Sequence, residues 1–277
     1  MIHTTHLFPE LDECLITLLK SLAPEEWEKP TVARLWKVRD VAAHLLDGNI
    51  RVISMYRDGY FTAPDREIKS YDDLVAYLNQ LNGDWVKASK RMSPALLTEL
   101  LESTGKQYSE IMRQQDLEAD AIFSVSWAGE ATSKNWFHIA REYTEKWHHQ
   151  QQIREAVDKP DIQRDIMTPR LFRPLIETFL RGLPHTYRHT QAPIGTAVRI
   201  AIKLDEVFEW FLVRAADGWL ITDTEEGETA ASVALDADTA WKLFTKAIKP
   251  DEALAMAHLT GNKELAGVTL NLIAVMA

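Results

Sequence analysis

The chain has 277 residues, 46% of them hydrophobic and 26% charged, which is the composition of a globular protein long enough for two domains. A formal net charge of −10 repels the phosphate backbone of nucleic acids, so we expect no nucleic-acid partner. The single cysteine, Cys14, excludes an internal disulfide and favours a cytoplasmic location, and we expect neither a signal peptide nor a membrane span.

Helical patterns dominate the first 160 residues, where apolar residues recur at the spacings of a buried helix face. The patterns cover residues 6–22, 38–57, 71–92, 94–115 and 134–157. Ser70, Ser93 and Ser133 precede the last three, and serine is a common N-terminal cap. Pro160 is the expected end of the last helix. Such a series predicts an up-and-down bundle.

The pattern changes near residue 190, where apolar and polar residues begin to alternate as they do in half-buried strands. The strand-like segments are 196–204, 208–224 and 231–238. Asp217-Gly218, inside the second segment, is typical of a hairpin turn. Further helical patterns cover residues 167–183, as one helix or a broken one, 238–248 and 263–277.

We therefore predict an α+β protein of two domains. The helical bundle is expected at residues 1–160, a connecting segment at 161–189 and a small α+β domain at 190–277.

The last helical pattern of the bundle carries a polar stripe. Its members are His138, Glu142, Glu145, His149 and Gln152, spaced 4, 3, 4 and 3 residues apart. Glu145 and His149 are one helical turn apart, so their side chains are able to bind one cation together. The opposite face is aromatic, and a helix of this kind is commonly a surface helix with a solvated polar stripe. His148 is expected to point about 100° away from His149.

A catalytic metal needs a further ligand, and His44 in the second helical pattern is the candidate. A histidine at the edge of an apolar stripe is also commonly a core residue, so this position leaves two interpretations open. Gly48 follows one turn later and opens space above His44, at a cost of about 1 kcal/mol in helix propensity relative to alanine.

Two segments resemble a known family. LWKVRDVAAHLLDGNIR, at 35–51, resembles the first signature of the DinB-like bundle enzymes, and WFHIAREYTEKWHHQQQIREAVDKP, at 136–160, resembles their last helix. With its trailing α+β domain the chain is similar to the mycothiol-dependent maleylpyruvate isomerase group. In that group a metal-binding DinB-like four-helix bundle precedes a small domain resembling sterol carrier protein folds.

The resemblance implies three metal ligands, His44, Glu145 and His149. One carboxylate and two imidazoles suit zinc best, with nickel as an alternative. It also implies an enzyme that uses a low-molecular-weight thiol, which is mycothiol, bacillithiol or glutathione. The thiolate would add to a cis double bond conjugated to a carbonyl, and rotation followed by elimination would leave the trans isomer.

Relatives in the wider superfamily transfer the thiol to an electrophile, so a thiol transferase is the nearest variant of this prediction. Two other classes stay open. One is a non-catalytic protein that binds a small molecule or lipid, and the other is a metal-dependent hydrolase. In each case we expect a small-molecule ligand or substrate and a monomer or homodimer.

Several residues are candidates to assist at the site. Arg51, seven residues after His44 and on the same helix face, is expected either to bind a carboxylate of the substrate or thiol, or to pair with Asp47 or Asp58. Gln152, one turn beyond the last proposed ligand, is a candidate to orient a ligand.

Trp127, in the loop before the last bundle helix, is expected either to cover the thiol pocket or to anchor the loop. His138 and Glu142 are candidates to support the ligands from the same stripe. Arg199 and Arg214 lie on predicted strands and offer cationic groups for an anionic substrate.

Overall fold

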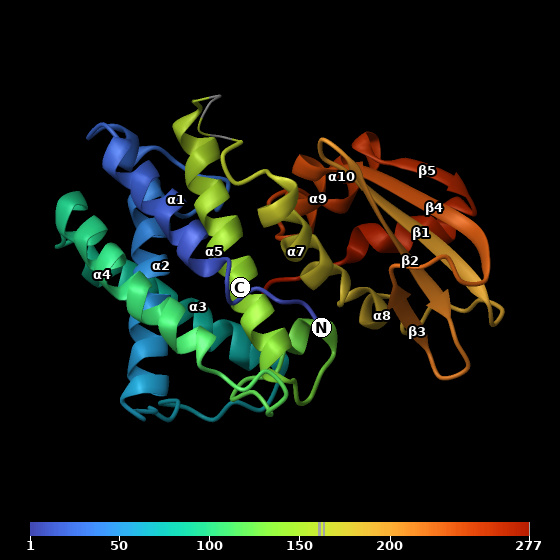
Figure 1. Ribbon diagram of the computed structural model, residues 1–277, viewed down its shortest axis with the longest axis horizontal. Coiled ribbons are helices and arrows are strands. Elements are labelled where there is room, and N and C mark those ends of the chain that lie inside the picture. Colours follow the sequence, from blue (N-terminus) through green and yellow to red (C-terminus); the bar gives the residue numbers. More distant parts are fainter. Residues whose placement is uncertain (160–161, 163, 277) are drawn as a thin grey trace. The chain divides into compact units, whose positions relative to one another are not determined.

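The computed structural model describes residues 1–276, with the exception of Pro160, Asp161 and Gln163. The chain divides into two compact units (Figure 1). The helical unit contains residues 3–118 and 145–166, and the sheet unit contains residues 1–2, 119–144 and 167–275. None of the helices formed by the described residues is both long and apolar enough to cross a membrane.

This arrangement has the two-part α+β architecture expected from the sequence, a helical region followed by a mixed sheet with helices. The domain boundaries expected after residues 160 and 189 stay predictions. Pro160, the expected end of the last bundle helix, lies outside the described residues, as does Asp161.

Helices that lie side by side build the helical unit (Figure 1). They are α1 (Phe8–Ser21), α2 (Val38–Val52), α3 (Tyr71–Ser89), α4 (Pro94–Arg113) and the part of α5 (Asn135–Val157) from residue 145 onward, with the short turns η1 (Glu26–Glu28) and η2 (Ile53–Arg57). Their buried leucine, valine and alanine side chains form one apolar cluster. Burial of this apolar surface is the main stabilising contribution to the unit.

Serine caps begin two of these helices as predicted. The hydroxyl of Ser70 accepts the backbone N–H of Asp73, and that of Ser93 accepts the N–H of Leu96. The third expected cap is wrong, because α5 begins two residues after Ser133. The Ser133 hydroxyl instead accepts a backbone N–H from the preceding loop, at Val125.

Of the two interpretations of the polar stripe of α5, the solvated surface helix is wrong, because the polar side chains of this helix are largely buried. Lys146 lies 2.9 Å from Asp12 of α1 and donates to Asn49 of α2 at 2.8 Å. Gln150 donates to the carbonyl of Leu11 at 2.9 Å. The polar face of α5 therefore faces neighbouring helices, and hydrogen bonds compensate the burial of its polar groups.

The described residues of the sheet unit form a mixed sheet in the order β3-β2-β1-β4-β5. The strands are β1 (Thr196–Lys203), β2 (Val207–Arg214), β3 (Trp219–Thr222), β4 (Glu228–Asp236) and β5 (His258–Gly261). β1 runs parallel to β4, and the other neighbouring strands are antiparallel. The hairpin predicted at Asp217-Gly218 is confirmed, since Arg214 pairs with Trp219 across it.

Short helices complete the sheet unit. They are η3 (Ser126–Ala128), α7 (Pro169–Leu180), α8 (Leu183–Thr186), α9 (Ala237–Phe244), α10 (Pro250–Met256), α11 (Lys263–Gly267) and η4 (Val268–Asn271), together with the first turns of α5. The helix expected over 167–183 is thus broken into α7 and the start of α8. The single helix expected over 263–277 is wrong, because α11 ends at Gly267, a short helical turn follows to Asn271, and residues 272–276 are irregular. Residue 277 lies outside the described residues.

Candidate metal centre

Helix α2 presents the first proposed ligand. A carboxylate oxygen of Asp40 accepts the backbone N–H of Lys37 at 3.0 Å and so fixes the start of the helix. Val41 and Leu45 are buried in the apolar cluster. His44 lies between them in sequence, on the border of that buried face, and is itself partly exposed.

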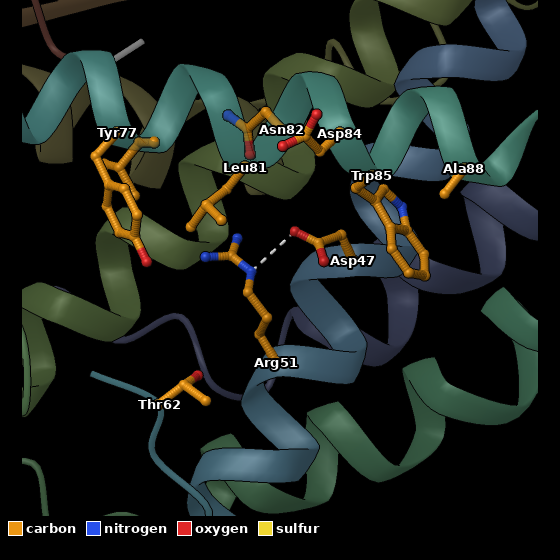
Figure 2. A pocket seen from close by; sticks show the side chains of 10 residues that line it. Asp47, Arg51, Thr62, Tyr77, Leu81, Asn82, Asp84, Trp85 and Ala88 are labelled. Carbon is orange, nitrogen blue, oxygen red and sulfur yellow. Dashed lines mark ion pairs between the residues drawn. The ribbon is translucent and has the colours of Figure 1, made fainter. Parts of the chain in front are cut away.

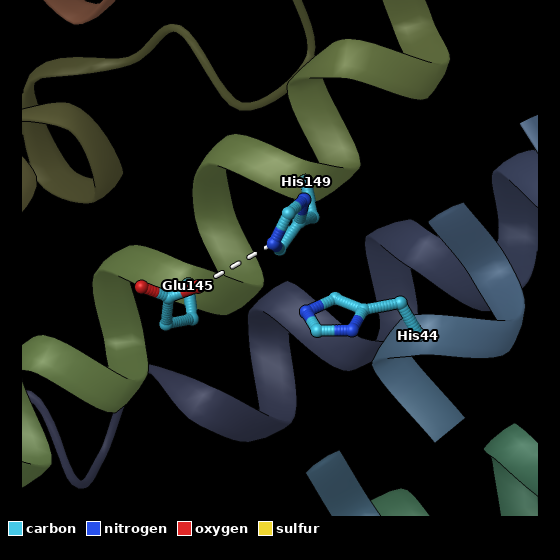
Figure 3. A group of neighbouring side chains, drawn as sticks. All are labelled: His44, Glu145 and His149. Carbon is cyan, nitrogen blue, oxygen red and sulfur yellow. Dashed lines mark ion pairs between the residues drawn. The ribbon is translucent and has the colours of Figure 1, made fainter. Parts of the chain in front are cut away.

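The second and third proposed ligands come from α5. Nε2 of His149 lies 3.4 Å from Oε2 of Glu145, as expected for residues one helical turn apart. Figure 3 shows His44 reaching toward both from the neighbouring helix. The rings of His44 and His149 meet edge to face with centroids 4.7 Å apart. The ligand atoms of all three residues lie within 4.8 Å of one another.

A hydrogen bond sets the orientation of the His149 ring. Its Nδ1 lies 2.9 Å from Oε1 of Gln152, and a carbonyl oxygen is able only to accept. With the Gln152 amide in this orientation, the tautomer with its hydrogen on Nδ1 makes the hydrogen bond, and the lone pair on Nε2 is directed toward Glu145. The role of Gln152 in orienting a metal ligand stays a prediction.

Electrostatics keep His44 in its neutral form. Loss of hydration lowers the pKa of His44 well below its ordinary value, and the neighbouring His149 lowers it further. The carboxylate of Glu145 opposes these effects by favouring the charged ring. A neutral imidazole at neutral pH has a lone pair available for a cation.

Trp36 was part of the sequence motif but had no predicted role. Its ring centroid lies 4.9 Å from that of His44 and 6.2 Å from that of His149. The indole therefore packs against both imidazoles and limits the positions that the rings are able to take. Its place two residues before the start of α2 was the available signal for this contact.

The donor set fits a divalent ion. Two imidazole nitrogens and one carboxylate oxygen are the ligands of many zinc sites, and ligands held 2.0–2.2 Å from a tetrahedral ion lie about 3.3–3.6 Å apart. The separation of 3.4 Å between Glu145 and His149 falls within that range. Since a tetrahedral ion accepts four ligands, three protein ligands leave a position for a small molecule.

The structure differs from expectation at His148. Its ring centroid lies 4.0 Å from that of His149, and its Nε2 lies 4.0 Å from Oε2 of Glu145. The side chain is therefore close to the proposed ligands instead of pointing away from them. It is nevertheless not a member of the three-residue group whose ligand atoms converge.

Arg51 adopts the second of its two expected arrangements. Its Nε lies 3.0 Å from Oδ2 of Asp47, one turn earlier on α2. Figure 2 shows this ion pair at the edge of a pocket, with the terminal guanidinium nitrogens directed away from Asp47. Gly48 lies between these two residues, and a Cβ added there would meet no atom within 4 Å. The sequence-based expectation of open space beside His44 agrees with this result.

The remaining candidates belong to the sheet unit. Trp127 is buried in η3 and packs edge to face on Phe137 with centroids 5.9 Å apart, which is the anchoring arrangement. Its expected part in covering a thiol pocket stays a prediction. His138 lies 2.7 Å from Arg141, and that arginine also pairs with Glu142 at 2.6 Å.

Arg199 and Arg214 also have protein partners in the sheet unit. Arg199 forms an ion pair with Glu209 on the adjacent strand. Arg214 donates to the carbonyl of Ala215. A role for either in binding a substrate stays a prediction.

The fold and the cluster of His44, Glu145 and His149 define a class of protein. Its members have a helical bundle that carries a histidine and carboxylate site, followed by a unit with a mixed sheet. The family model described as mycothiol maleylpyruvate isomerase N-terminal domain matches residues 8–154, which is more than half of the chain. The chain therefore belongs to this family. The family is one of enzymes, which confirms the prediction that the chain is an enzyme.

One solved structure shows the same fold at low sequence identity. A structure of a mutant of the mycothiol-dependent maleylpyruvate isomerase matches with a TM-score of 0.51 and 10% identity, over 92% of this chain and 91% of that chain. A second structure of the mycothiol-dependent maleylpyruvate isomerase has a TM-score of 0.49 and 12% identity, over 86% of each chain. A search of curated proteins gave no match.

Proposed function

We propose that the protein is a thiol-dependent isomerase that converts the cis double bond of a small conjugated carbonyl compound to trans. The observation that carries this proposal is the convergence of His44, Glu145 and His149 within 4.8 Å in a member of the mycothiol maleylpyruvate isomerase family. Zinc is the divalent ion that this donor set favours. Mycothiol is the thiol named for the family and for the solved structures with this fold.

The divalent ion would supply Lewis acidity and stabilise the thiolate form of a bound thiol at neutral pH. The protein's part is to hold and orient. His44 stays neutral, Gln152 fixes the His149 ring, and Trp36 packs against both imidazoles. Arg51 and Gln152 are the proposed assisting residues of the reaction, the first in ligand binding and the second in positioning.

The test is turnover of maleylpyruvate by the full chain loaded with zinc, followed with and without mycothiol. We expect isomerisation that requires both zinc and thiol, and we expect His44→Ala and Glu145→Gln to abolish it while far-ultraviolet circular dichroism stays unchanged. Product analysis separates the two thiol chemistries, because an isomerase returns free thiol whereas a transferase leaves it in the product.

The alternatives give different results in the same experiments. Hydrolysis of esters or amides without thiol would replace this proposal with a metal-dependent hydrolase. A protein that binds no stoichiometric divalent ion and turns over neither class of substrate would be a binding protein, and the proposal would be wrong.

A further inference from the structure

A buried lysine of α5 lies where the helices of the bundle meet. Lys146 is 6% exposed and follows the proposed ligand Glu145 directly in sequence. Its ammonium group donates to Oδ1 of Asp12 on α1 at 2.9 Å and to Oδ1 of Asn49 on α2 at 2.8 Å. The same group lies 4.3 Å from the ring centroid of Tyr108 on α4. The ammonium group therefore has a partner on each of three neighbouring helices.

Further hydrogen bonds hold the two oxygen acceptors of this lysine in place. Asn49 is 1% exposed, and its Nδ2 donates to Oγ1 of Thr104 on α4 at 3.0 Å, which leaves Oδ1 for Lys146. The Asp12 carboxylate accepts from the hydroxyl of Ser109 on α4 at 3.2 Å. The acceptors of Lys146 are thus oriented by contacts of their own, and the five side chains form one largely buried network.

Gly105 of α4 makes room for this network. A Cβ atom at Gly105 would lie 2.9 Å from Oδ2 of Asp12, so a side chain there would displace the carboxylate. Glycine is an unfavourable residue inside a helix, because it loses more conformational freedom on folding than other residues do. Its presence in α4 is explained by the space that Asp12 needs in order to reach Lys146 and Ser109.

The network joins the same two helices that carry the proposed metal ligands (Figure 3). His44 lies on α2, and Glu145 and His149 lie on α5. Asn49 follows His44 by five residues, an axial rise of about 7.5 Å, and Lys146 precedes His149 by three, a rise of about 4.5 Å. The hydrogen bond between Lys146 and Asn49 therefore links α2 to α5 within about a turn and a half of the imidazole pair.

The axial position of α2 against α5 matters because metal ligands tolerate little displacement. Apolar contacts are non-directional, so they hold two helices together without fixing how far one has slid along the other. A slide by one residue would move His44 about 1.5 Å, whereas the ligands of a metal site have to be held to within about 0.5 Å. A hydrogen bond of 2.8 Å would break under such a slide. Buried polar groups fix the register of packed helices in coiled coils by the same means.

We propose that Lys146 and Asn49 are positioning residues of the metal centre. Their hydrogen bond fixes the axial register of α2 against α5 in which His44 meets Glu145 and His149. This inference rests on the proposed function for the metal ion, but the register of the two imidazoles does not depend on it. Since the same network also stabilises the bundle, position and stability have to be measured separately.

The test is Asn49→Leu in the full chain, because this substitution removes the link between α2 and α5 with little other change. Leucine is close to asparagine in volume. Lys146 keeps Asp12 and the ring of Tyr108 as partners, and the Thr104 hydroxyl still donates to a carbonyl of its own helix at 2.6 Å. No buried charge is left without a partner, so we expect the variant to fold.

Three measurements on Asn49→Leu report the position of the ligands. We expect the zinc affinity to fall at least tenfold in a competition titration. The visible absorption of bound Co²⁺ depends on coordination geometry and should change. In the metal-free chain with isotopically labelled histidine, the nuclear Overhauser contact between the rings of His44 and His149 should weaken, since their centroids are 4.7 Å apart in the intact site.

Three further variants separate position from stability. Ser109→Ala removes a hydrogen bond of the same network, between α4 and α1, and leaves Lys146 bonded to Asn49, so it should match the wild type in all three measurements. Asn49→Asp keeps an oxygen acceptor for Lys146 and should restore the ring contact that Asn49→Leu loses. Lys146→Met/Asp12→Leu removes the link together with both charges, so it should retain much of the stability and still show the losses of Asn49→Leu.

Either wild-type zinc affinity or an unchanged ring contact in Asn49→Leu would overturn the proposal. Losses of the same size in Ser109→Ala would also overturn it, because the network would then act through stability alone. If the wild type binds no divalent ion, the proposed metal centre is wrong, and the ring contact in the metal-free chain decides the register by itself.

Discussion

At the scale of single residues, the hydrogen bond from His149 to Gln152 decides which imidazole nitrogen faces the proposed metal. Gln152→Leu removes that acceptor, so we expect zinc affinity to fall about 10- to 100-fold. Gln152→Glu keeps an acceptor and should restore most of the affinity. A competition titration against a chromophoric chelator measures both variants. Wild-type affinity in Gln152→Leu would show that the ring is oriented by other contacts.

A second residue-scale prediction concerns pH. Burial, with a smaller contribution from the neighbouring charge of Arg141, lowers the pKa of His138 from 6.5 to about 4, and the carboxylate of Glu142 partly opposes the shift. Between pH 6.5 and about 4, His138 binds a proton more readily in the unfolded chain than in the folded one. The contribution of this residue to the free energy of unfolding therefore falls as the pH drops through that range, and it is constant above it. The loss from this group amounts to about 3 kcal/mol.

Urea unfolding at pH 7 and pH 4 measures this effect. His138→Gln should remove much of the difference between the two pH values, whereas His258→Gln, at an exposed position of β5, should retain it. Equal pH dependence in the wild type and His138→Gln would contradict the assignment.

At the scale of elements, Lys146 joins α5 to three other helices. It pairs with Asp12 of α1, donates to Asn49 of α2 and lies 4.3 Å from the ring centroid of Tyr108 on α4. Lys146→Met leaves a carboxylate without its cation in a largely buried place, so we expect a loss of about 3 kcal/mol in the free energy of unfolding.

An exposed pair between α1 and α4 provides the comparison. Lys20 and Glu102 lie 2.6 Å apart with both side chains substantially exposed, so Lys20→Met should cost less than about 1 kcal/mol. The double variant Lys146→Met/Asp12→Leu should recover much of the loss, since it removes both charges. Similar costs for Lys20→Met and Lys146→Met would show that the buried network contributes little.

In helix α5 the sequence predicted the helix itself but not the burial of its polar side chains. Periodicity identified α5 and the spacing of Glu145 and His149, but it treated the polar stripe as solvated. A polar stripe that forms hydrogen bonds to other helices has the same periodicity as one that faces water. Residue spacing shows which side chains share a face of the helix, but it does not show whether solvent or protein lies against that face. The contacts of Lys146 and Gln150 with α1 depend on residues more than 130 positions away.

At the scale of the whole molecule, the sequence predicted the α+β class, the helical bundle and the β2–β3 hairpin, because each has a strong local pattern. Short elements were missed. α10 has seven residues and β5 has four, which are too few to show a clear periodicity of apolar residues. Pro250 and the two acidic residues after it are nevertheless typical of the start of a helix. Trp36 was missed as a contact of both imidazoles because its packing against His149 depends on α5, which is more than 90 positions away in sequence.

The most direct test of the central claim is an equilibrium zinc titration of the full chain and three single variants. We predict one ion per wild-type chain, loss of that binding in His44→Ala and His149→Ala, and its retention in His148→Ala, whose ring is near the cluster but outside it. Zinc at 100 times its dissociation constant should stabilise the wild type by about 2.7 kcal/mol and leave His44→Ala unchanged. Stoichiometric binding that survives both His44→Ala and His149→Ala, or no binding by the wild type, would contradict the account.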